Sequence, residues 1–126
     1  MQKIIITDKA PGAIGPYSQA VQAGDFLFAS GQIPMDPETG QMVTGDIKEQ
    51  TTRVLENVKG LLEGAGFSMG QVVKSMIYIT SMEDFAAVNE VYGRYFIENP
   101  PSRACVAVKE LPKGAHIEIE VVAWKG

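Results

Sequence analysis

The sequence predicts an α+β protein in which one six-stranded sheet carries two helices on one of its faces. Six short segments are rich in β-branched and aromatic residues, whereas two longer segments repeat apolar residues at helical spacing. The 126 residues suit one hydrophobic core, and they contain no internal repeat, low-complexity tract or linker. We therefore expect a single domain that spans residues 1–126.

The N-terminal third of the chain is expected to form three strands, at residues 4–7, 17–23 and 26–30. Gly24 and Asp25 separate the second strand from the third, and a two-residue link that contains glycine favours a hairpin. Segments 11–16 and 31–45 are rich in glycine and proline, which predicts loops.

The first helix is expected to begin at Ile47, where apolar residues start to recur every three, four and seven positions. Asp46 can accept hydrogen bonds from amides of the first turn, and Glu49 stands three residues later, as in a capping box. Gly64 and Gly66 suit the C-terminal end of the helix. Its apolar face comprises Ile47, Val54, Leu55, Val58, Leu61 and Leu62.

The rest of the chain predicts a strand at 72–80, a second helix, and two final strands at 104–108 and 117–124. Ser81 and Asp84 supply a start signal for the helix, and the prolines at 100 and 101 prevent its continuation. The apolar face of this helix comprises Phe85, Val88, Val91, Tyr92 and Tyr95.

The strands at 26–30, 72–80 and 117–124 are apolar at both alternating positions, so both faces of the sheet contain apolar residues. An antiparallel sheet with one face in water alternates apolar and polar residues instead. Two helices cover one face only, and an uncovered apolar face of this size is unusual. We therefore expect other copies of the chain to cover it in a homo-oligomer.

Alternation along the last strand directs Ile117, Ile119 and Val121 toward the helices and leaves Glu118 and Glu120 on the opposite face. The same alternation, with Val106 and Val108 assigned to the helix side, predicts which residues share the open face. These are Arg103, Cys105, Glu118 and Glu120. A guanidinium and carboxylates on one surface form either a ligand site or a structural ion pair between subunits.

Taken one by one, the candidate residues also have simpler interpretations. In this interpretation, Arg103 is an ordinary surface or ion-paired arginine, and Cys105 is a small buried apolar side chain. If the last two strands form a hairpin, Cys105 and His116 lie roughly 10 to 13 Å apart, too far for a catalytic dyad.

Composition argues against several classes of protein. One cysteine and one histidine cannot build a structural zinc site, so no metal is expected. Eleven Lys and Arg against fifteen Asp and Glu give a net charge of -4, which makes nucleic acid an unlikely partner. No apolar run is long enough for a signal peptide or a membrane span, so we expect a cytoplasmic protein.

Five sequence blocks, in order along the chain, resemble the RidA family, also called YjgF or enamine/imine deaminases. The blocks are APGAIGPYSQ at 10–19, ASGQIP at 29–34, DFAAVNEVY at 84–92, PSRACV at 101–106 and IEIE at 117–120. The resemblance implies a chorismate-mutase-like α+β fold and a homotrimer with three clefts between subunits. It also implies cofactor-free hydrolysis of 2-aminoacrylate, through its imine, to pyruvate and ammonia. That activity, a 2-iminobutanoate/2-iminopropanoate deaminase, limits damage by reactive metabolites.

Carried over by position, the resemblance makes Arg103 the carboxylate clamp and Glu118 the residue that orients the attacking water, and it gives Glu120 no catalytic part. The residues expected to line the cleft are Tyr17, Ser30, Gly31, Asn89 and the backbone of Cys105. Two alternatives stay open. One is a regulatory protein that binds small ligands in the same clefts without turnover. The other is a translation-inhibiting ribonuclease, which the acidic charge and the lone histidine disfavour.

Overall fold

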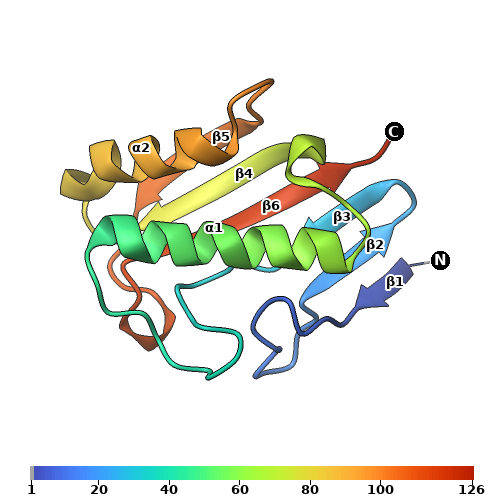
Figure 1. The fold of residues 1–126 in the computed structure, drawn as a ribbon, viewed down its shortest axis with the longest axis horizontal. Helices are drawn as coiled ribbons and strands as arrows, with labels where there is room; N and C mark the ends of the chain where they lie inside the picture. The colour runs from blue at the N-terminus through green and yellow to red at the C-terminus, as the bar shows by residue number, and fades with distance from the viewer. Residues whose placement is uncertain (1) are drawn as a thin grey trace.

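The computed structural model describes residues 2–126 and contains six strands and two α-helices. The strands are β1 (Gln2–Ile5), β2 (Ala20–Ala23), β3 (Phe26–Ala29), β4 (Val72–Ile79), β5 (Ser102–Ala107) and β6 (Ile117–Trp124). The helices are α1 (Ile47–Gly64) and α2 (Phe85–Tyr95). All six strands form one sheet in the order β1-β2-β3-β6-β4-β5, and both helices lie across the same face of it (Figure 1). The predicted α+β architecture is confirmed.

Local sequence signals account for the limits of α1. The Asp46 side chain accepts a hydrogen bond from the backbone N–H of Glu49 at 2.9 Å, which satisfies one free amide of the first turn. Gly66 follows the helix with φ at +82°, a backbone conformation that glycine adopts without strain. Five of the six residues of its expected apolar face are buried: Val54, Leu55, Val58, Leu61 and Leu62.

The core lies between the helices and the covered face of the sheet. Ile117, Ile119, Val121 and Ala123 of β6 all point into it, as the alternation predicts. From α2, Val88, Val91 and Tyr92 are buried against them. Phe85 was expected on this buried face as well, but 38% of it is exposed at the start of α2.

The last two strands do not form a hairpin, because β4 lies between β5 and β6. The connection through α2 leaves β5 parallel to β4, at the edge of the sheet. His116, which precedes β6, hydrogen-bonds through Nδ1 to the Thr80 hydroxyl at 3.1 Å. The hairpin pairing that would set the distance between Cys105 and His116 therefore does not occur.

The strand register also reverses the expected face of β5. Arg103 lies level with Ser75 and, beyond it, with Val121, whose side chain is in the core. Cys105 is likewise level with the buried Ile77. Residues in register share a face of the sheet, so Arg103 and Cys105 are on the helix side. The expectation that they share the open face with Glu118 and Glu120 is wrong.

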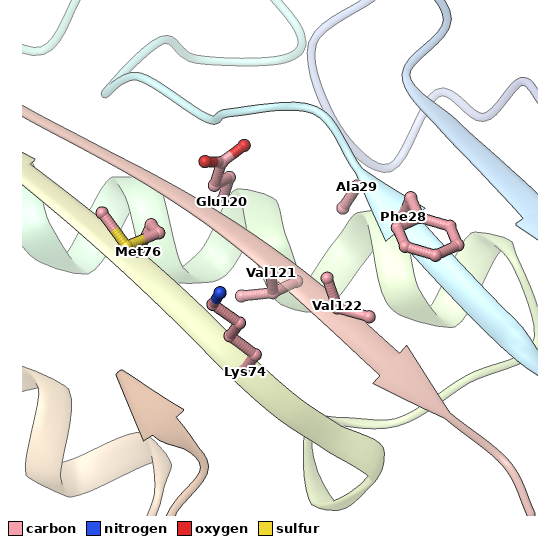
Figure 2. Close-up of a pocket in the computed structure, with 7 residues that line it drawn as sticks. All are labelled: Phe28, Ala29, Lys74, Met76, Glu120, Val121 and Val122. Atoms are coloured by element: carbon pink, nitrogen blue, oxygen red, sulfur yellow. The ribbon is translucent and has the colours of Figure 1, made fainter. Parts of the chain in front are cut away.

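The open face is apolar and exposed, in agreement with the sequence. Five of its large apolar side chains are 40 to 50% exposed: Ile4, Phe26, Phe28, Val106 and Trp124. Figure 2 shows the middle of this face, where Phe28, Met76 and Val122 surround a hollow that Lys74 and Glu120 border. Within residues 2–126, no helix is long and apolar enough to cross a membrane.

Candidate functional site

Glu118 is recessed on the open face beside the segment that follows β3. Gln32 and Ile119 exchange two backbone hydrogen bonds, of 2.9 and 3.1 Å, which hold this segment against the start of β6. Gly31 thereby lies next to Glu118, and a methyl group on its Cα would overlap the Glu118 carboxyl group. The absence of a side chain at position 31 is therefore what admits the carboxylate.

The loop that carries Tyr17 is held by a buried amide. The Gln19 side chain donates to the carbonyl oxygens of Ala10 and Pro11, at 3.3 and 2.8 Å, and so closes the loop onto β2. The Ser30 hydroxyl donates to the Ser18 carbonyl at 2.6 Å. These bonds place Tyr17 and Ser30 at the rim of the hollow that contains Glu118.

This hollow, called the carboxylate cleft here, has a volume of about 450 Å³. Among the residues lining it are Ile14, Tyr17, Ser30, Gly31, Lys113, Glu118 and Glu120. Glu118 is half-buried there, and burial raises the pKa of its carboxyl group, with a smaller contribution from the charge of Glu120. A carboxylate of raised pKa is a stronger base and takes part more readily in proton transfer near neutral pH.

Arg103 lies on the other side of the sheet, against α2. Its guanidinium donates to Asn89 Oδ1 at 2.5 Å and lies 4.9 Å from the centre of the Tyr92 ring. The exposed Phe85 ring is 5.7 Å away. No acidic side chain of the described residues forms an ion pair with Arg103. The guanidinium is therefore oriented by neutral groups and keeps its capacity to bind a carboxylate.

At Cys105 the backbone N–H and C=O, rather than the thiol, are the groups available for polar contacts. Burial raises the pKa of the thiol, although the charge of Arg103 opposes this, so the reactive thiolate form is disfavoured. The N–H of Val108 donates to Ile79 of β4, and in a parallel pair successive residues direct their backbone groups to opposite sides. The N–H and C=O of Cys105 thus point to the free edge of the sheet, beside Arg103.

The residues expected at the site therefore form two groups within one chain. Tyr17, Ser30, Gly31 and Glu118 border the carboxylate cleft, whereas Arg103, Asn89 and the Cys105 backbone lie at the β5 edge. No cluster of three or more His, Cys, Asp or Glu side chains suitable for a metal ion occurs in residues 2–126.

Sequence reasoning missed two aromatic neighbours of Arg103, namely Phe85 and Tyr92. Both were assigned to the core because they fit the apolar repeat of α2. Phe85 is four residues before Asn89, however, and this spacing puts the two side chains on one face of a helix. Asn89 was already a candidate, so that spacing was a usable signal for Phe85.

The described residues form a small α+β protein with an arginine at the β5 edge of its sheet and a recessed glutamate on the open face. Comparisons with known proteins agree. The family model described as Endoribonuclease L-PSP matches residues 7–125. The chain belongs to this family, which is the RidA/YjgF family.

Three relatives illustrate the similarity. A RutC family protein of Pyrococcus horikoshii is 55% identical over 99% of both chains. A crystal structure from Thermotoga maritima, described as a candidate endoribonuclease, has a TM-score of 0.98 and 56% identity, covering 100% of this chain and 99% of that one. TdcF of Escherichia coli, whose name describes a candidate reactive intermediate deaminase, is 48% identical over 98% of this chain and 97% of its own. Its crystal structure with bound serine has a TM-score of 0.94 and 46% identity, with 98% and 99% of the two chains covered.

Proposed function

We propose that the protein is a homotrimeric deaminase that hydrolyses 2-imino acids in clefts between its subunits. The substrate class is the imine of 2-aminoacrylate and its close homologues, and the products are a 2-oxo acid and ammonia. The observation that carries this proposal is the arrangement of Arg103 and Glu118, which are complementary in chemistry but lie on opposite faces of one sheet.

A second copy of the chain is the partner that can complete such a site. The open face contains exposed Phe26, Phe28 and Trp124, and covering them would remove a large apolar area from water. If the β5 edge of one subunit lies along the open face of the next, Arg103 of the first approaches Glu118 of the second. Cyclic repetition of this contact closes after three subunits in the proposed trimer.

The residue types suit hydrolysis of an α-imino acid. Arg103 binds the substrate carboxylate, and the Cys105 N–H at the strand edge is available as a further donor. Glu118 accepts a proton from water as the water oxygen bonds to the carbon of the protonated imine, the C=N electron pair moves to nitrogen, and a neutral carbinolamine forms. Glu118 then returns the proton to nitrogen. The carbon–nitrogen bond breaks, ammonia leaves, and loss of the hydroxyl proton yields the 2-oxo acid.

The relatives support this substrate class. TdcF has been crystallised with serine, which has the carboxylate and α-nitrogen of a 2-imino acid on a similar carbon skeleton. The name of TdcF describes a candidate deaminase of reactive intermediates. The chemistry and the name point to the same reaction class.

Mixing two inactive variants tests both the reaction and the shared cleft. Arg103→Ala and Glu118→Gln are each expected to lose turnover of 2-aminoacrylate that a dehydratase generates in the assay. After unfolding and refolding together in equal amounts, a cleft is intact when its arginine comes from one variant and its glutamate from the other. Random mixing makes about one cleft in four intact, so about a quarter of the parental activity returns.

The outcomes separate the alternatives. No recovery in mixed trimers of an active parent would place both residues in one subunit and contradict the shared cleft. A parent that binds 2-oxo acids but never accelerates 2-oxo acid formation would contradict the deaminase and support a ligand-binding regulator instead.

A further inference from the structure

Glu120, which the family resemblance leaves without a role, is held in place beside Glu118. The Tyr78 hydroxyl donates to Glu120 Oε1 at 2.6 Å, across the antiparallel pair of β4 and β6. Tyr78 is the register partner of Glu118, so its hydroxyl reaches diagonally to the next residue on the same face. Glu118 and Glu120 both line the carboxylate cleft, two residues or about 6.7 Å apart along the strand.

The charged and titratable groups around Glu118 come from several elements. Glu120 shares its strand, Tyr78 faces it from β4, and Lys113 and Tyr17 border the cleft from two loops. Lys74 lies further along the open face of β4, level with Val122. Neither of the ion pairs found in residues 2–126 includes Glu118. The negative charge nearest along its own strand face is therefore that of Glu120.

We propose that Glu120, anchored by Tyr78, is a positioning residue that makes the Glu118 carboxylate a stronger base toward the attacking water. A fixed negative charge near Glu118 opposes its ionisation, and a carboxylate that holds a proton more tightly also takes one from water more readily. This inference rests on the proposed function for its catalytic consequence, while the coupling between the two carboxylates exists without it.

Two pKa directions agree with the geometry. The hydrogen bond to Glu120 is the largest cause of a raised pKa at Tyr78, as expected for a phenol that donates to a carboxylate. The pKa of Glu118 is raised first by burial and then by Glu120. If Arg103 of a neighbouring subunit enters the cleft, it acts on every variant alike, so comparison with the parent isolates the effect of Glu120.

Nuclear magnetic resonance measures the coupling directly. Protein labelled with ¹³C at the glutamate carboxyl carbon is titrated with acid, and the Glu118 signal is assigned by its absence from Glu118→Gln. In Glu120→Gln the titration midpoint of Glu118 should move to lower pH. The acid limb of the pH profile of kcat/KM should move in the same direction, with kcat reduced a few-fold. Affinity for pyruvate, measured by calorimetry, should stay that of the parent.

Three further variants complete the test. Glu120→Asp keeps the charge, so its midpoint should remain above that of Glu120→Gln. Tyr78→Phe loses only the hydroxyl that anchors Glu120, and a smaller shift to lower pH is expected. Glu63→Gln changes the same charge at the exposed end of α1 and should leave the midpoint at the parental value.

The results distinguish this inference from the proposed function. An unchanged or higher Glu118 midpoint in Glu120→Gln, with the assembly intact, would overturn the positioning role even in an active deaminase. A lower midpoint in a protein without deaminase activity would leave the coupling standing and remove the proposed function. If Glu120→Gln fails to assemble, Glu120→Asp and Tyr78→Phe decide the question, because equal midpoints in both and in the parent would overturn it.

Discussion

Arg103 and Glu118 lie on opposite faces of one sheet, on strands β5 and β6 that are separated by β4. No side-chain rotation brings them together, because the sheet itself stands between them. Any reaction that needs both groups must therefore take them from two chains.

Replacing Arg103 should weaken ligand binding without disturbing the fold. Arg103→Ala removes charge-assisted hydrogen bonds to the ligand carboxylate and should reduce affinity for pyruvate or 2-ketobutyrate at least about tenfold. Arg103→Lys keeps the charge but loses the planar pair of donors, so it should restore affinity only in part. Calorimetry gives both values, and parental affinity in a trimeric Arg103→Ala would show that the clamp lies elsewhere.

Replacing Glu118 should lower turnover strongly and change ligand affinity little. Glu118→Gln is nearly the same size but cannot accept a proton from water, so turnover should fall by about 100-fold or more. Affinity for 2-oxo acids should change little, because Arg103 is the residue proposed to make the main ionic contact. Steady-state turnover and calorimetry on the same preparation separate these effects. An equal loss of affinity and turnover would assign Glu118 a structural role.

Sedimentation equilibrium at micromolar concentration should give a mass near three chains. Phe28→Glu places a charge in the middle of the apolar open face, where Phe28 is now 50% exposed, and should shift the mass toward one chain. Lys59→Glu adds negative charge on an exposed position of α1 and serves as the control that should remain trimeric. A parental protein with the mass of one chain would contradict the shared cleft.

The contact between Gly31 and Glu118 makes a further prediction. A methyl group at position 31 would overlap the Glu118 carboxyl group, so Gly31→Ala must displace it from the cleft. Because a displacement of about 1 Å can cost about 100-fold in rate, turnover should fall strongly. Gly93→Ala in α2 is the matched control, since a methyl group there meets no atom within 4 Å. Turnover of Gly31→Ala at the parental level would show that the carboxylate position is not critical.

Tyr95 predicts how stability depends on alkaline pH. Burial, followed by the 2.7 Å hydrogen bond to Glu56, raises the pKa of Tyr95 to about 12, compared with 10.0 for the free side chain. The folded protein thus holds this proton more tightly than the unfolded chain does. The resulting stability is fully present below pH 10 and is lost as the pH rises toward 12.

Thermal unfolding of the parent and of Tyr95→Phe at pH 9 and at pH 11.5 checks this prediction. The parent should have the higher Tm at pH 9, and its advantage should shrink at pH 11.5. An advantage that stays constant or grows would show that Tyr95 does not contribute in this way.

The regular elements could be predicted well because their signals are local. The periodicity of α1 and its cap at Asp46 occur within one segment, and the alternation in β6 separates Ile119 from Glu118 without further information. The open apolar face could be predicted because both faces of the sheet are apolar and two helices cover only one of them.

The face of β5 could not be found in this way. Alternation divides its residues into two sets, but it does not say which set meets the helices. Ala104 and Cys105 are both small, and the strand offers no row of large buried side chains like that of β6. The register with β4 decides the matter, and it depends on the crossover through α2, which brings together residues far apart in the chain.

The loop around Gln19 is already ordered in the protein without a ligand. Its main chain packs so closely on α1 that a methyl group at Gly60 would overlap the Lys9 carbonyl, and Gln19 fastens it from the other side. The entropy of ordering this loop is therefore lost during folding, before any ligand arrives. Tyr17 and Ser30 are preorganised, so a ligand bound in the proposed cleft would not lose free energy to immobilising them.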